Sequence, residues 1–280
     1  MRKAILALAL TAFVAVGASA TEDATTPGIP SALDGSFPIL GEIALDEALL
    51  GGSADYCVGV GFDGDNFWVS SGDQGTGTCM FSIIDEFGNL VDQVPQGAGA
   101  SGWGHRDLCW DGTYMYGSFS TMVNAFAGDY QYFNFFIGYH NPNRAQAWDG
   151  SYFYTANFSD PLTRMEFTAW GAPATCTPLA SFDGVYGAAY EGGEDILYLT
   201  SANYTGDLYT CTTDGFPLNV YTCMPEYDIQ GGCTMACISL GDVLCVLQQF
   251  GPDMLTFYDI GAGPSPVDAS SWGTIKAMFR

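Results

Sequence analysis

The apolar and polar positions of the chain follow one pattern twice, in residues 106–116 and in residues 144–154. In each stretch a short segment of alternating residues leads to Asp-Gly, and a second alternating segment follows. Alternation with a period of two predicts half-buried strands, and Asp-Gly tolerates the positive φ that a tight hairpin turn requires. Each stretch is therefore predicted to be a β-hairpin.

Weaker copies of this hairpin occur in residues 58–69, 187–199 and 235–246. Successive turn glycines lie 38 to 48 residues apart: Gly64, Gly112, Gly150, Gly193 and Gly241. A repeat of about 40–50 residues built only from strands is typical of β-propeller blades, whereas a β-sandwich shows turns about every 8–12 residues without a longer period. The sequence predicts an all-β, five-bladed β-propeller. Six or seven blades stay open as alternatives, with a degenerate blade in residues 97–104 or near the N-terminus.

The repeats divide the domain into blades at about residues 56–95, 103–139, 143–182, 185–227 and 233–258. The last of these has only three predicted strands. Residues 37–45 form a further apolar segment ahead of the first repeat, and a strand in that place can complete the last blade. Closure of this kind removes a sheet edge that would otherwise promote aggregation. We therefore expect residues 37–45 to pair with the C-terminal blade and close the ring.

Both ends of the chain differ in composition from the repeats. Residues 1–20 combine two cations, an apolar run and a small-residue end, which is typical of a cleaved secretory signal. Residues 21–36 are polar and contain two prolines, so they are predicted to be a flexible leader. The propeller domain is expected over residues 37–262, followed by a linker and C-terminal tail in residues 263–280. The protein is thus expected to be secreted, periplasmic or attached to the cell surface.

The chain is strongly acidic, with 7 basic and 31 acidic residues and a formal net charge of −24. Arg2 and Lys3 leave with the signal, so the mature chain carries 5 basic residues and a charge of −26. Nucleic acid and anionic lipid are attracted by clusters of lysine and arginine, which this composition does not provide. No apolar run after residue 20 is long enough to span a bilayer. We expect neither nucleic-acid binding nor membrane insertion.

Nine cysteines, all after the signal, fit an exported protein with disulfides. Cys57 and Cys79 flank the first Asp-Gly hairpin, and Cys211 and Cys223 flank a hairpin that turns near residue 214. These are the two pairs that we expect first, although spacing alone does not define connectivity. The odd count leaves at least one thiol without an intramolecular partner.

Candidate binding residues stand at equivalent places in two neighbouring repeats. Arg106 and Arg144 both lie six residues before a turn glycine, with His105 and Asn143 immediately ahead of them and Asp107 after the first. Matching positions in adjacent blades should become neighbours at one mouth of the central channel. Two guanidinium groups there could hold a carboxylate, sulfate or phosphate. Alternatively, each arginine pairs with a protein carboxylate such as Asp107, or with backbone carbonyls that tie the blades together.

Signals for catalysis are sparse. His105 and His140 are the only histidines, and no Gly-x-Ser-x-Gly motif for a nucleophilic serine occurs. Asp63 and Asp65 resemble part of a calcium loop without its remaining ligands, so the turn reading is favoured and Ca²⁺ is a weak alternative. No other cofactor is expected, and an enzyme is the less favoured class.

The repeated Trp-Asp-Gly hairpins, together with the Trp-Gly-Thr-Ile-Lys segment that begins at Trp272, resemble secreted bacterial propeller-like repeat proteins. That resemblance implies an exported protein with a propeller fold, and it implies no particular activity. The Phe-Asp-Gly opening at residues 62–64 is similar to that of five-bladed glutamine cyclotransferases, but no matching glutamate motif follows it.

These observations favour an extracellular or cell-surface binding module with its ligand at the channel mouth. The partner would be a small anionic ligand, a glycan or a surface protein. A propeller enzyme, either glutaminyl cyclotransferase-like or active on glycans, is the first alternative. A structural surface component that uses the C-terminal tail is the second.

Overall fold

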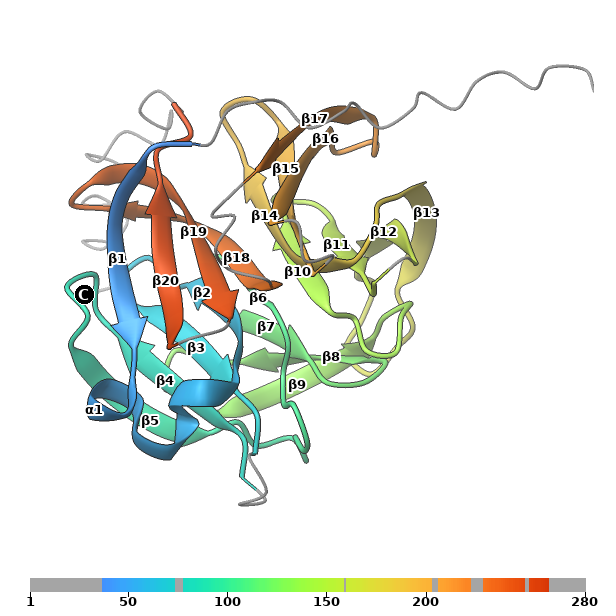
Figure 1. Cartoon of the computed structure of the whole chain (residues 1–280). Coiled ribbons are helices and arrows are strands. Elements are labelled where there is room, and N and C mark those ends of the chain that lie inside the picture. Colours follow the sequence, from blue (N-terminus) through green and yellow to red (C-terminus); the bar gives the residue numbers. More distant parts are fainter. Residues whose placement is uncertain are drawn as a thin grey trace, which may run out of the picture.

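Five four-stranded antiparallel sheets surround a central axis, so the chain forms a five-bladed β-propeller (Figure 1). The computed structural model describes residues 37–73, 78–158, 160–202, 206–222, 229–249 and 252–261. The predicted fold and the predicted number of blades are confirmed. The expected signal, leader and C-terminal tail lie outside the described residues.

Each of the first four blades is one continuous run of four strands, numbered from the axis outward. Blade one contains β2 (Cys57–Phe62), β3 (Phe67–Ser71), β4 (Met80–Ile84) and β5 (Leu90–Pro95). Blade two contains β6 (Leu108–Trp110), β7 (Met115–Ser118), β8 (Met122–Phe126) and β9 (Tyr132–Ile137). Blade three contains β10 (Ala145–Trp148), β11 (Phe153–Ala156), β12 (Pro161–Glu166) and β13 (Thr175–Ser181). Blade four contains β14 (Val185–Glu191), β15 (Ile196–Ser201), β16 (Asp207–Thr212) and β17 (Pro217–Thr222).

Blade five is built from both ends of the domain, as the sequence predicts. Its inner strands are β18 (Ile229–Ile238), β19 (Gly241–Gln249) and β20 (Asp253–Tyr258), and its outer strand is β1 (Ile39–Leu45). β1 runs antiparallel to β20, with Leu45 opposite Asp253 and Ile39 opposite Tyr258. Figure 1 shows the blue N-terminal strand lying beside the red C-terminal one. This pairing closes the ring and covers the outer edge of β20.

The Asp-Gly turns between the two innermost strands are held by the aspartate itself. Asp111 Oδ1 accepts hydrogen bonds from the backbone N–H groups of Thr113 and Tyr114, and its Oδ2 accepts one from the hydroxyl of Tyr116. Gly112 follows with φ of 94°, which a residue with a Cβ rarely adopts. The equivalent turn after β10 repeats this arrangement, and so the repeated sequence motif is a capped hairpin turn.

The hydrophobic core consists of five clusters, one at each contact between neighbouring blades. The cluster between blades one and two, for example, contains Trp68 and Phe81 from one side and Leu108 and Phe126 from the other. The other four clusters join blades two and three, three and four, four and five, and five and one. Because every blade buries apolar surface on both faces, each one contributes to holding the ring together.

One short helical segment departs from the expectation of strands only. α1 (Glu47–Leu50) and the 3₁₀ helix η1 (Gly51–Tyr56) connect β1 to β2, and Asp46 caps α1 by accepting from the Leu49 N–H. The segment is too short to give a helical periodicity in the sequence. Neither helix of the described residues has the length and hydrophobicity needed to cross a bilayer.

The expected disulfides are absent from the described part of the chain, where no disulfide joins any of the eight cysteines. Cys57 lies opposite Ser71 on β3, and Ser71 lies opposite Met80 on β4, so a whole strand separates Cys57 from Cys79. Two strand spacings are about 9–10 Å, beyond the reach of a disulfide. The predicted Cys57–Cys79 bridge is therefore wrong.

The second expected bridge also lacks support. Cys211 lies next to the hairpin turn, opposite Pro217, and its thiol is free. Thr222 lies opposite Asp207, at the other end of the same hairpin. Cys223 is outside the described residues.

Candidate functional site

Asp107 lies at the axis, where it joins four of the five blades. It precedes β6, and its side chain is fully buried. Its Oδ2 accepts hydrogen bonds from the backbone N–H groups of Gln146 in blade three (3.1 Å) and Ala188 in blade four (2.7 Å). Its Oδ1 accepts one from the N–H of Cys233 in blade five (3.0 Å). Burial raises the pKa of this carboxyl group well above its usual range, and these backbone hydrogen bonds oppose the shift. The sequence placed Asp107 at a ligand site, whereas its oxygens bind the protein's own strands.

The inner strands approach each other so closely here that side chains are excluded at two positions. A Cβ on Gly59 of blade one would overlap the carbonyl oxygen of Arg106, and a Cβ on Gly232 of blade five would overlap Oδ1 of Asp107. Glycine is therefore required at both positions because a side chain would not fit there, and not because of the backbone angles. The axis at this level is filled by backbone and by Asp107.

Arg106 and Arg144 occupy equivalent positions, as predicted. The N–H of Arg106 donates to the Ser118 carbonyl, and the N–H of Arg144 donates in the same way to the Ala156 carbonyl, one strand outward in each blade. Burial lowers the pKa of Arg106 to about 10, and the positive charge of Arg144 contributes to that shift. The N–H of Asp107 also donates to the Arg144 carbonyl at 3.0 Å, so the two arginines lie near each other, at the end of the channel where the inner strands begin.

Aromatic rings surround both guanidinium groups. The Cζ of Arg144 lies 4.1 Å from the ring centroid of Phe158 and 4.5 Å from that of Tyr186, so the guanidinium group lies against two rings that contact each other edge to face. The Cζ of Arg106 lies 5.7 Å from the ring centroid of Trp103. Trp103 and Phe158 are both exposed. Each arginine is thus positioned by ring stacking at the edge of the solvent.

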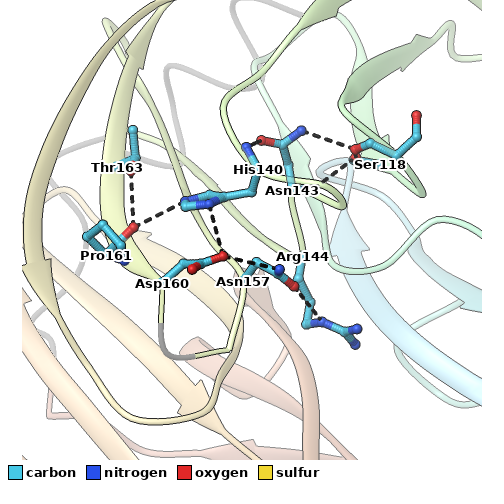
Figure 2. A network of polar contacts seen from close by, with 9 residues as sticks. Ser118, His140, Asn143, Arg144, Asn157, Asp160, Pro161 and Thr163 are labelled. Carbon is cyan, nitrogen blue, oxygen red and sulfur yellow. Dashed lines mark hydrogen bonds and ion pairs between the residues drawn. The ribbon is translucent and has the colours of Figure 1, made fainter. Parts of the chain in front are cut away.

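No carboxylate neutralises this pair within the part of the chain that the structure describes. The ion pairs found there join His140 to Asp160 and Arg164 to Asp214. Arg144 Nε donates to the amide oxygen of Asn157 at 3.3 Å, and Figure 2 shows its terminal nitrogens extending past that contact. The Nε of Arg106 is buried and has no hydrogen-bond partner. The alternative in which both arginines pair with carboxylates such as Asp107 does not describe this site.

His105 lies in the interior between blades one and two, away from the channel mouth. Its Nδ1 is 3.0 Å from Gln96 Oε1 and its Nε2 is 3.0 Å from Asn124 Nδ2. The Gln96 oxygen is an acceptor, so Nδ1 carries the hydrogen and Nε2 accepts from Asn124. Burial lowers the pKa of His105 to about 3. This histidine is neutral and part of the core.

Asn143 is also buried, in a network that links blades two and three (Figure 2). Its Nδ2 donates to the carbonyl of Thr121 at 3.1 Å, and its Oδ1 accepts the N–H of His140 at 2.9 Å. His140 in turn contacts the Pro161 carbonyl through Nε2 and Asp160 through Nδ1. Of the five predicted site residues, only the two arginines reach the channel mouth.

The carboxylate of Asp63 is occupied by its own turn. Its Oδ1 accepts from the N–H groups of Asp65 and Asn66, and its Oδ2 accepts from Trp68 Nε1. No cluster of three or more metal-ligating side chains occurs among the described residues. Calcium binding by Asp63 and Asp65 stays a prediction that these contacts do not support.

A pocket of about 460 Å³ opens at the opposite mouth, where the inner strands end in their turns. Its wall contains Phe62, Trp110, Trp148 and Tyr190 from blades one to four. This pocket was not predicted from the sequence. The signal was present nevertheless, because each of these aromatic residues stands directly before the acidic residue that begins its turn.

Comparison with solved structures places the fold among known propellers. The glutaminyl cyclase of Myxococcus xanthus is similar with a TM-score of 0.57 and 13% identity, over 79% of this chain and 94% of that one. A gluconolactonase of Xanthomonas campestris is similar with a TM-score of 0.48 and 15% identity, over 79% and 98%. The similarity to the glutaminyl cyclase, at 13% identity, shows a shared fold alone. No protein-family model and no curated protein matches the sequence.

Proposed function

We propose that the protein is an exported propeller that binds an anionic ligand at the mouth of the channel beside Arg106 and Arg144. The observation that carries the proposal is a pair of neighbouring arginines with no carboxylate partner among the described residues of a strongly acidic chain. Two like charges held together in partly buried positions destabilise each other, and a bound anion relieves that repulsion.

The aromatic surroundings narrow the class of ligand. Trp103 is exposed beside Arg106 and lies 6.0 Å from Tyr56 between ring centroids, and Phe158 is exposed beside Arg144. Exposed rings next to a cation fit a ligand that carries an apolar face close to its negative group. An acidic sugar has both, because its ring can stack on an aromatic side chain while its carboxylate or sulfate binds a guanidinium group.

The two arginines have different roles in this proposal. Arg106 is only partly buried and supplies the direct contact to the anion. Arg144 is 7% exposed, so it acts mainly through its positive charge and by holding Phe158 and Tyr186 in place. Loss of Arg106 should therefore weaken binding more than loss of Arg144.

The test is calorimetric titration with a galacturonic acid oligosaccharide and with a neutral glucan oligosaccharide of the same length. The wild-type protein should bind the acidic sugar and not the neutral one, and added salt should weaken binding. The double variant R106Q/R144Q should lose at least tenfold in affinity, since a hydrogen bond to a charged group is worth about 1.5–3 kcal/mol. R164Q is the matched control, because it removes an arginine of blade three that pairs with Asp214.

Equal affinity of R106Q/R144Q and wild type would overturn the proposal, as would equal binding of both sugars. Thermal unfolding of each variant separates lost binding from lost structure. A separate incubation with glutaminyl peptides addresses the enzyme alternative. Turnover that R106Q/R144Q does not affect would place the function elsewhere in the molecule.

A further inference from the structure

The pocket at the turn end of the channel is walled by a partial ring of aromatic side chains. Phe62, Trp110, Trp148 and Tyr190 occupy corresponding positions in four blades, directly before the acidic residue that begins the turn, and all four are half-buried. One side of each residue packs into its blade, as Trp148 does against Phe153 with 4.5 Å between ring centroids. In blade five the equivalent residue is not aromatic, so the ring is open on that side.

Gln146 belongs to the wall of this pocket and carries a buried acceptor without a partner. Gln146 is 2% exposed, and its Nε2 donates to the carbonyl oxygen of Asn143 at 3.2 Å. That bond fixes the orientation of the amide, and Oε1 is left without a hydrogen bond. An unsatisfied buried acceptor costs about 1–3 kcal/mol. This oxygen has almost no exposed surface, so a cation in the pocket would be attracted by its unpaired partial negative charge without a direct hydrogen bond.

The charged residues that line the pocket are all acidic. The lining includes Glu191 and Asp242 and contains no lysine, arginine or histidine. Asp63, Asp111 and Asp149 stand in the turns at the same end of the channel, directly after three of the ring aromatics. The neighbouring pair of arginines lies at the other end, and Arg164 is paired with Asp214. The electrostatic potential at this mouth therefore favours cations.

From these three features we infer that the pocket binds a small organic cation, namely a protonated amine with an apolar body. The ammonium group would face the rings of Trp110 and Trp148, which attract a cation through their π-electrons, and the unpaired Oε1 of Gln146 adds to that attraction through its partial negative charge. Leu108, Ala147 and Ala188 supply apolar wall for the body of the ligand. A volume of about 460 Å³ lies within the usual range for sites of small molecules.

This inference does not depend on the anion site. The two mouths are separated by the layer in which Asp107 binds the backbone of blades three, four and five. Occupation of one site should therefore leave the other available. An acidic sugar and an amine are expected to bind without competing for the same residues.

The experiment uses 2-phenylethylammonium as the probe and 2-phenylethanol as its uncharged counterpart. Titrations follow heat and tryptophan fluorescence with the full protein at neutral pH. The amine should bind at least tenfold more tightly than the alcohol, because the alcohol lacks the charge that the rings and carboxylates attract. Equal affinity for both would overturn the inference and leave only an apolar pocket. Absence of amine binding at millimolar concentration would overturn it as well.

Variants locate the site. Gln146→Leu should weaken amine binding, because the partial negative charge of Oε1 is lost, and should change alcohol binding less. Trp148→Leu should weaken the amine through loss of the ring. Trp103→Leu is the matched control, since it removes an exposed tryptophan at the arginine mouth, and should bind the amine as wild type does.

Thermal unfolding of each variant confirms that titrations are performed on folded protein. If Gln146→Leu is folded and binds the amine as tightly as wild type, the role assigned to Oε1 of Gln146 is wrong. If Trp103→Leu loses binding while Trp148→Leu keeps it, the amine binds at the other mouth and the inference fails.

Discussion

Replacing Asp107 by alanine should destabilise the whole ring, although the residue is one of 31 acidic side chains. The carboxylate accepts hydrogen bonds from Gln146, Ala188 and Cys233, each in a different blade. Removing it leaves three buried N–H groups without an acceptor, at about 1–2 kcal/mol each, or about 3–6 kcal/mol together. Domains of this kind are stable by about 5–15 kcal/mol, so the loss is a large share of the total.

The measurement is the free energy of unfolding from urea titration, with circular dichroism and tryptophan fluorescence as two probes. Asp107→Asn should lie between wild type and Asp107→Ala, because one oxygen is kept while the new NH₂ group faces backbone donors. Asp92→Ala is the control, since Asp92 is exposed on the outermost strand of blade one. A loss below about 1 kcal/mol for Asp107→Ala would show that Asp107 does not hold the blades together.

Two further predictions concern the buried residues His105 and Gly59. His105 has a pKa of about 3 in the folded state, against 6.5 ordinarily. Between pH 6.5 and pH 3 this histidine is therefore protonated in the unfolded chain and not in the folded one. Lowering the pH to 4 should reduce the free energy of unfolding by about 3 kcal/mol. The His105→Gln variant should lack this loss of stability in acid, whereas His140 affects the variant and the wild type alike. Identical pH profiles of unfolding for the two proteins would contradict a neutral, buried His105. Gly59→Ala should lower the melting temperature by many degrees because its Cβ overlaps backbone, while Gly52→Ala, with open space around its Cβ, should not. Equal melting temperatures for these two variants would refute the close packing of the inner strands.

The blades and their closure could be predicted because they depend on local patterns. Asp-Gly turns repeat at similar distances along the chain, and the last blade has three predicted strands where the others have four, so its fourth strand had to come from elsewhere. The equivalence of Arg106 and Arg144 followed from the same register. What repeats along the chain is therefore visible in the sequence.

Features that depend on contacts between blades were not visible. His105 precedes Arg106 directly, yet it lies in the core because the segment ahead of β6 enters the space between two blades. The role of Asp107 requires strands from three other blades to converge on it. The disulfide prediction failed because hairpin spacing says nothing about the strand that lies between Cys57 and Cys79.

The pairing of β1 with β20 has a consequence for biogenesis. A ribosome makes β1 first and its partner last, so the final blade cannot assemble until almost the entire domain has been translated. Contacts between such distant segments also slow folding. A circular permutant that starts at Cys57 and joins Tyr258 to Ile39 through a linker would make every blade contiguous. It should fold faster than the natural order while keeping the same architecture.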